Sequence, residues 1–142
     1  MVYLLTYGTL MESESRNEIL EQFGCKHVKD VLLKYHKLSH FYQSCFPVAE
    51  KTKNENDKIF CEVYTLGYEP RELIMTLNYI EGVGQLYEIE SITNGNNRYL
   101  LYCGISNFWK ELDQGMSELP NGKKWCSTFP YYTTHKENLE VI

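Results

Sequence analysis

The chain has 142 residues, and with 14 Lys and Arg against 19 Asp and Glu its formal net charge is −5. This length predicts one domain over residues 1–142, long enough to bury a core without disulfide or metal staples. The acidic balance without a basic stripe argues against a dedicated nucleic-acid binder and against an anionic membrane surface as partner. No apolar run reaches the roughly 20 residues of a transmembrane helix.

The first residues have neither the basic region nor the long apolar region of a signal peptide. The chain has five cysteines, an odd number, without a Cys-x-x-Cys motif. These features predict a cytoplasmic protein with reduced thiols, not a disulfide framework or a zinc ribbon. The favoured interpretation of each cysteine is a small buried apolar residue. The five are Cys25, Cys45, Cys61, Cys103 and Cys126.

The first quarter of the chain predicts a strand, a turn and a helix. Residues 2–6 are β-branched, aromatic or apolar, which is typical of a buried strand. A glycine-containing turn at residues 7–11 follows. Ser15 as N-cap and Glu18 three residues later fit a capping box, and Gly24 is expected to end the helix that they open.

The middle of the chain predicts further strands. Residues 28–42 fit either one bent strand or two short ones, and Pro47 breaks the pattern that follows. Residues 51–58 are highly polar and predict a solvated loop or hairpin tip. Residues 59–66 alternate between two faces, as in a half-buried strand.

A second helix is expected to open at Pro70 and to end at Gly82, because apolar residues recur at helical spacing between them. Alternation over residues 86–93, a turn, and residues 99–105 then predict a hairpin. The remainder is less regular, with a short helix expected at 107–114 and a packed tail at 125–132. This order predicts an α+β fold with a curved or barrel-like mixed sheet and flanking helices.

The turn formed by Tyr7, Gly8, Thr9 and Leu10 is the first candidate site. A strand ends there and a helix is expected within a few residues, so free N–H groups and the helix dipole could hold an anionic group such as a carboxylate. The alternative is a tight strand-to-helix connection without a ligand, since turns with one glycine are common.

Glu81 is the second candidate, at the C-terminal end of the second predicted helix. The negative end of the helix dipole and partial burial would both raise its pKa, which suits a proton shuttle near neutral pH. The alternative is an exposed glutamate in a solvated turn.

His36 and His40 lie four positions apart and can share a face. No acidic or cysteine partner stands near them in the sequence, so no metal site is predicted there. The chain also lacks a Walker A loop, a Rossmann glycine pattern and the common metalloprotease and serine-hydrolase motifs.

Taken together, several segments resemble the gamma-glutamylcyclotransferase-like family over residues 3–105. Each motif alone is short, but their order and spacing match that family. The segments are Tyr7-Gly8-Thr9-Leu10 with Asn17, Phe46-Pro47-Val48-Ala49, Cys61-Glu62-Val63-Tyr64, and Leu77-Asn78-Tyr79-Ile80-Glu81-Gly82 followed by Tyr87.

The resemblance implies a compact mixed α+β barrel around one pocket. It implies that Glu81 is the general acid/base and that the backbone of Tyr7 to Leu10, with Tyr87, binds the γ-glutamyl part of a small-molecule substrate. The α-amine of that substrate would attack its own γ-carbonyl and release 5-oxoproline and an amine, without metal or cofactor. The Tyr-Gly-Thr-Leu form is closest to the gamma-glutamylamine cyclotransferase branch.

Some positions depart from the family's pattern. Met11-Glu12-Ser13-Glu14 stands where many relatives carry a basic residue and glycine, and Glu12 near the pocket mouth would disfavour an anionic leaving group. Ile89 replaces a usual arginine. These changes keep a second hypothesis open, a non-catalytic small-molecule binder. A third is a protein-interaction module that uses the aromatic segment 125–132.

Overall fold

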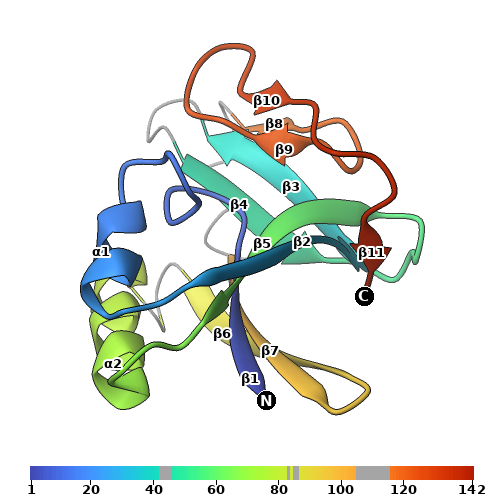
Figure 1. The fold of residues 1–142 in the computed structure, drawn as a ribbon. Coiled ribbons are helices and arrows are strands. Elements are labelled where there is room, and N and C mark those ends of the chain that lie inside the picture. Colours follow the sequence, from blue (N-terminus) through green and yellow to red (C-terminus); the bar gives the residue numbers. More distant parts are fainter. Residues whose placement is uncertain (42–45, 83, 85–86, 105–115) are drawn as a thin grey trace.

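The computed structural model describes residues 1–41, 46–82, 84, 87–104 and 116–142. These residues form a mixed sheet structure with two helices (Figure 1). In chain order the elements are β1 (Val2–Thr6), α1 (Asn17–Gln22), β2 (His27–Lys34), β3 (His36–Phe41), β4 (Phe46–Lys51), β5 (Lys58–Thr65), α2 (Pro70–Glu81), β6 (Tyr87–Asn94), β7 (Asn97–Gly104), β8 (Met116–Glu118), β9 (Lys124–Trp125), β10 (Tyr132–Thr133) and β11 (Glu140–Val141).

The main sheet has six strands in the order β11-β2-β5-β1-β7-β6. β1 lies inside it, antiparallel to β5 and parallel to β7, with Leu4 opposite both Tyr64 and Leu100. A second sheet has the order β4-β3-β8, and β9 and β10 form a short pair. The predicted α+β class is confirmed. Within the described residues the main sheet is open, with β11 and β6 as its edges, and not a closed barrel.

The segment from 28 to 42 forms two strands, not one. The chain turns at Tyr35, whose φ of 65° lies in the left-handed region. As a result β2 pairs with β5 in the main sheet, whereas β3 pairs with β4 and β8 in the second sheet. This turn places two strands that are adjacent in sequence in different sheets.

Pro47 does not end the strand pattern, as the sequence predicted, but lies inside β4 opposite His40. β4 is an edge strand of the second sheet. A proline without an N–H is tolerated there because the outer side of an edge strand needs no ladder hydrogen bond. The expectation of a break at Pro47 was therefore wrong.

The capping box predicted for α1 is also wrong. The helix begins at Asn17, with Arg16 as N-cap and without a side-chain cap hydrogen bond. Backbone carbonyls of the preceding loop bind the N–H groups there instead: Arg16 N–H donates to Thr9 O at 2.8 Å and Asn17 N–H to Glu14 O at 3.2 Å. Because the loop folds back on itself, Ser15 does not act as the cap.

The second helix follows the prediction closely. Pro70 occupies its first turn, where no N–H is needed, and Gly82 ends it in the left-handed conformation with φ of 62°. Leu73 and Leu77 are fully buried. The spacing of the apolar residues therefore fixes which face of α2 meets the sheet.

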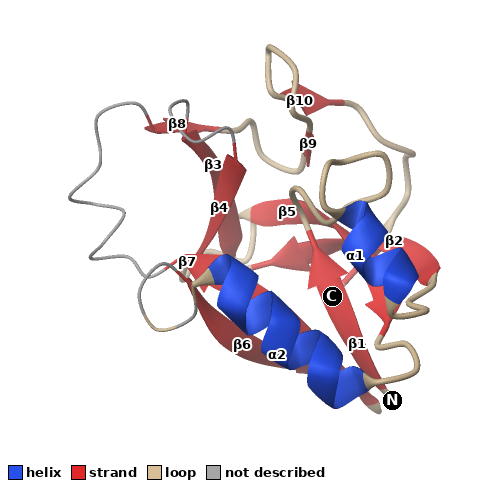
Figure 2. Ribbon diagram, turned by 90° about the vertical axis from the view of Figure 1, so that its left-hand side faces the viewer, coloured by secondary structure: helices blue, strands red, loops and turns tan. Residues whose placement is uncertain are grey.

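The main sheet buries apolar residues on both faces, because successive side chains of a strand point in opposite directions. Leu4 belongs to the cluster that packs against α1 and α2. Leu5 belongs to the cluster on the other face, together with Trp125 from the C-terminal part. Both helices lie on the same side of the main sheet (Figure 2).

The segment 125–132, for which the sequence predicted a packed tail, is packed only in part. Trp125 is 1% exposed, whereas Phe129 is 82% exposed. The helix expected at residues 107–114 lies outside the described residues. No helix in the described ranges combines the length and the apolar character that crossing a membrane requires.

Candidate functional site

A pocket of about 130 Å³ lies where the end of β1, the loop after it, the end of α2 and strands β4, β6 and β7 meet. All six residues singled out from the sequence line it: the turn residues Tyr7, Gly8, Thr9 and Leu10, with Glu81 and Tyr87. The rest of the lining, which the sequence analysis did not assign to a site, is Leu5, Thr6, Arg16, Phe46, Pro47, Ile80 and Tyr102.

Gly8 allows the turn to approach β4 closely. A Cβ atom built on Gly8 would lie 2.6 Å from Cγ of Pro47, far inside van der Waals contact. In the part of the chain that the structure describes, the N–H groups of Gly8, Thr9 and Leu10 donate to no protein acceptor. The turn therefore presents free hydrogen-bond donors beside the pocket, as the sequence suggested.

The prediction that a helix dipole acts on this turn is wrong. α1 begins only at Asn17, well after Leu10, and has six residues. The positive charge at the pocket comes instead from the guanidinium group of Arg16, which belongs to the lining. No motif indicated Arg16, because only the fold of the loop brings this exposed side chain to the pocket.

Glu81 ends α2 and lies at the pocket, so its alternative interpretation as a solvated surface residue does not hold. Burial raises the pKa of this carboxyl group, and the nearby charge of Arg16 opposes the increase. Within the described lining, Glu81 is the acidic residue. The arrangement places a carboxyl group with raised proton affinity beside free N–H donors.

Three tyrosines complete the pocket wall. The hydroxyl of Tyr87 donates to Pro47 O at 3.0 Å, that of Tyr102 to Asn78 Oδ1 at 2.8 Å, and that of Tyr7 to the carbonyl of Tyr102. Burial is the main cause that raises the pKa of each phenol. The phenols are therefore neutral at physiological pH.

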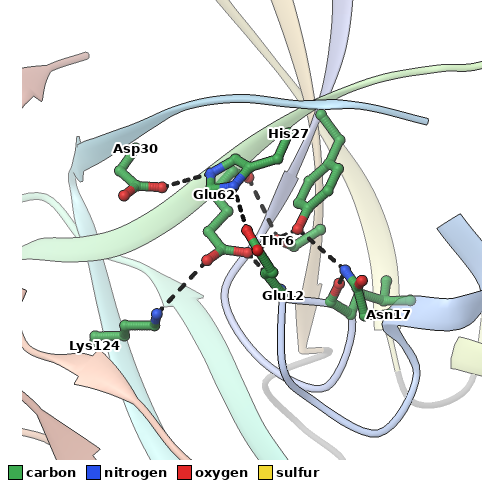
Figure 3. A network of polar contacts seen from close by, with 9 residues as sticks. Thr6, Glu12, Asn17, His27, Asp30, Glu62 and Lys124 are labelled. Atoms are coloured by element: carbon green, nitrogen blue, oxygen red, sulfur yellow. Dashed lines mark hydrogen bonds and ion pairs between the residues drawn. The ribbon is translucent and has the colours of Figure 1, made fainter. Parts of the chain in front are cut away.

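A buried carboxylate behind the turn holds the loop in place (Figure 3). Glu62 is 2% exposed, and its Oε1 accepts the backbone N–H of Glu12 at 2.7 Å and the hydroxyl of Tyr64 at 2.9 Å. The amide of Asn17 donates to that hydroxyl at 3.1 Å and to Leu10 O at 2.8 Å. This chain of hydrogen bonds connects β5 to the loop that carries the free N–H groups.

Glu12 does not face the pocket. Its Oε2 lies 2.9 Å from Nδ1 of His27, whose Nε2 lies 2.7 Å from Asp30 (Figure 3). Burial alone would lower the pKa of His27, but hydrogen bonds to Glu12 and Asp30 raise it. The expected position of Glu12 at the pocket mouth is not supported, because this residue is absent from the described pocket lining and its carboxylate contacts His27. Its effect on an anionic leaving group stays a prediction.

The family described as gamma-glutamyl cyclotransferase, AIG2-like, matches residues 4–127. No curated protein matches the chain. Among solved structures, an uncharacterized protein of Pyrococcus horikoshii is 24% identical, with a TM-score of 0.57 over 73% of this chain and 78% of that one.

Two further solved structures share the fold. Escherichia coli ytfP is 16% identical, with a TM-score of 0.61 over 84% of this chain and 93% of that one. Kluyveromyces lactis allophanate hydrolase is 14% identical, with a TM-score of 0.62 over 83% of this chain but 19% of that longer one. Since the family match covers most of the sequence and both motifs of the pocket, this chain belongs to the gamma-glutamyl cyclotransferase, AIG2-like family.

Proposed function

We propose that this protein cleaves a γ-glutamyl amide by ring closure and releases 5-oxoproline with a free amine or amino acid. The observation that carries the proposal is the position of Glu81, a carboxyl group with raised pKa in the same pocket as the free N–H groups of Gly8, Thr9 and Leu10. The resemblance of the motifs points to the gamma-glutamylamine branch.

The reaction does not need a nucleophile from the protein. The α-amine of the substrate attacks its own γ-carbonyl, so a new C–N bond closes a five-membered ring and the original amide C–N bond breaks. Attack within one bound molecule gains from orientation, and the small pocket limits the conformations of the chain. We therefore expect the protein to act without metal or cofactor.

Glu81 carries the proton in this mechanism. As carboxylate it takes a proton from the substrate's ammonium group, which frees the amine for attack. As carboxylic acid it gives that proton to the nitrogen that leaves. Burial raises the pKa of Glu81 and so favours the protonated form that the second transfer requires.

The free N–H groups of the turn stabilise the negative charge on the carbonyl oxygen during attack. Gly8 is required for this role, because its contact with Pro47 sets the position of the turn. Arg16 adds positive charge at the same pocket and attracts the carboxylate of a γ-glutamyl group.

The test is incubation of purified protein with γ-glutamyl amines, γ-glutamyl amino acids and glutathione, with mass spectrometry for 5-oxoproline. Glu81→Gln should lower turnover of an active substrate by about 10²- to 10⁴-fold, the usual contribution of a general acid/base. Glu72→Gln is the matched control, since Glu72 is exposed in the first turn of the same helix. Full turnover by Glu81→Gln would remove Glu81 from the mechanism.

The second candidate function is non-catalytic binding of a small molecule in the same pocket. It is favoured by the departures from the family's usual pattern at Ile89 and in the segment from Met11 to Glu14, because a shared fold does not determine an activity. A ligand held equally well by the unmodified chain and by Glu81→Gln, without any product, would support binding over catalysis.

The expected location and partners accompany the same proposal. We expect a cytoplasmic protein, since the described cysteines Cys25, Cys61, Cys103 and Cys126 are free thiols. The proposed partner is a small γ-glutamyl compound, not a nucleic acid or a membrane. Use of the segment 125–132 as a protein-binding surface is weakened by Trp125, which packs in the core.

A further inference from the structure

A second cluster of reactive side chains lies apart from the proposed site. His36 comes from β3, Glu90 from β6 and Cys103 from β7. Nε2 of His36 lies 2.8 Å from Oε2 of Glu90, and Sγ of Cys103 lies 3.1 Å from the same oxygen. One atom from each of the three lies within 4.8 Å of the others.

The fold brings Glu90 and Cys103 to His36, and the sequence alone could not predict these contacts. The partners are 54 and 67 positions away, as counted from residues 36, 90 and 103. His40, the neighbour that the sequence pattern paired with His36, accepts a hydrogen bond from the Trp125 indole at 3.0 Å. The two histidines therefore belong to different surroundings.

The orientation of the His36 ring is fixed from behind. Its Nδ1 lies 2.7 Å from the carbonyl oxygen of Lys34, so Nδ1 carries a proton and donates it. This leaves Nε2 directed at Glu90. A backbone carbonyl that holds one ring nitrogen while the other faces a cation is the usual support of a metal-binding histidine.

We propose that His36, Glu90 and Cys103 form a binding site for a borderline-soft divalent cation of the zinc type. Imidazole nitrogen, carboxylate oxygen and thiolate sulfur are the ligand types that zinc takes, and three protein ligands leave a fourth position for water. On binding, the protons that lie between the three ligand atoms pass to solvent and the cation takes their place. No electron is transferred.

The two contacts to Glu90 need only a small adjustment. Tetrahedral zinc with bonds of about 2.0–2.3 Å separates its ligand atoms by roughly 3.4–3.6 Å. The contacts to Glu90 are 2.8 and 3.1 Å, so the side chains must move apart by about 0.5 Å. Lys51 contacts the other carboxylate oxygen, Oε1, at 3.4 Å and can leave it, because its side chain is 69% exposed.

An access path leads to the cluster. A surface hollow of about 520 Å³ is bordered by Glu50, Lys51, Glu88, Glu90 and Cys103, among others. The carboxylates of Glu50 and Glu88 outnumber the one ammonium group of Lys51, so the potential of this lining favours a cation. The site does not depend on the proposed enzyme activity.

The cation would connect the two sheets. His36 belongs to the sheet of β4, β3 and β8, whereas Glu90 and Cys103 belong to the main sheet. A ligand that binds the folded chain and not the unfolded chain raises the free energy of unfolding, and with it the melting temperature, by an amount that grows with the logarithm of its concentration divided by its dissociation constant. Zn²⁺ should therefore stabilise the fold.

The experiment is equilibrium dialysis of the full chain against Zn²⁺, with Co²⁺ absorption as a second readout. We expect one equivalent of Zn²⁺ and a thiolate-to-cobalt charge-transfer band. Cys103→Ser and Glu90→Gln should each weaken binding at least about tenfold, as loss of a ligand does. Cys126→Ser and His27→Gln are matched controls, and both should bind Zn²⁺ as the unmodified chain does. His27 is chosen because it forms, with Asp30 and Glu62, another group of possible metal ligands.

Two results would overturn the proposal. One is binding that survives Cys103→Ser but is lost in His27→Gln. The other is the absence of both bound Zn²⁺ and a thiolate–cobalt band in the unmodified chain. This second result does not depend on whether any variant folds.

Discussion

Adding one methyl group at Gly8 should destabilise the protein through a single contact. The backbone of Gly8 is not in the left-handed region, so alanine is free of conformational strain there. The added Cβ would lie 2.6 Å from Cγ and 2.9 Å from Cδ of Pro47. The proline ring is rigid, so the turn or β4 must move.

The magnitude follows from two opposing effects. Overpacking of this kind costs about 1–3 kcal/mol. Replacing glycine by alanine at an unstrained position otherwise stabilises by about 0.4–1 kcal/mol, because the unfolded chain loses freedom. We therefore expect Gly8→Ala to lower the free energy of unfolding by about 1–2 kcal/mol in the unmodified chain. The same change should be neutral or stabilising when Pro47→Ala has removed the ring.

A double-mutant cycle in denaturant measures this difference directly. The free energy of unfolding is compared for the unmodified chain, the two single variants and the double variant. A coupling energy of at least about 1 kcal/mol is expected between Gly8 and Pro47. An equal loss from Gly8→Ala in both backgrounds would refute the argument that Pro47 imposes glycine at this position.

Four further predictions concern the pocket and the residues behind it. Because the folded pKa of Glu81 is raised, its carboxyl group favours the fold at pH values below the unfolded pKa, and this contribution is lost as pH rises through the folded pKa. Glu81→Gln should therefore be at least as stable as the unmodified chain at pH 7. Thermal unfolding over pH 4–8 would show that this advantage in stability shrinks toward acid pH. In the proposed mechanism, the same raised pKa should place the acid limb of the rate profile above the ordinary range of a glutamate, and a limb at the ordinary value would contradict it. Glu62→Gln should lower the free energy of unfolding by about 1–3 kcal/mol in chemical denaturation, because the backbone N–H of Glu12 and the hydroxyl of Tyr64 lose a charged acceptor. An unchanged denaturation midpoint would show that this hydrogen-bond network does not hold the loop. Arg16→Gln should raise KM more than it lowers kcat, whereas Arg71→Gln on the exposed face of α2 should change neither.

Local sequence signals predicted the elements whose causes are local. Alternation identified β5, and the span from Pro70 to Gly82 matched α2 because a proline at the start and a glycine at the end act on the backbone directly. Six of the residues that line the pocket were also predicted, since the turn after β1 and the end of α2 with the following Tyr87 each carry a recognisable motif.

Prediction from the sequence failed where tertiary contacts determine the local structure. Ser15 had the pattern of a cap, but carbonyls of a folded loop took its place. Pro47 looked like a strand breaker, yet an edge strand tolerates it. Arg16 could not be assigned to the pocket, nor Glu90 and Cys103 to His36, because only the pairing of distant strands and the path of a loop bring these side chains together.

The most direct test of the central claim is the identity of the acidic product. Ring closure by the substrate's own amine predicts one 5-oxoproline for each amine released, with no glutamate, and predicts that Glu81→Gln lowers both yields together. Mass spectrometry of a time course with an active γ-glutamyl compound measures the two yields side by side. Release of glutamate in place of 5-oxoproline would mean that water attacks the carbonyl, and the account of the pocket as a ring-closing site would be contradicted.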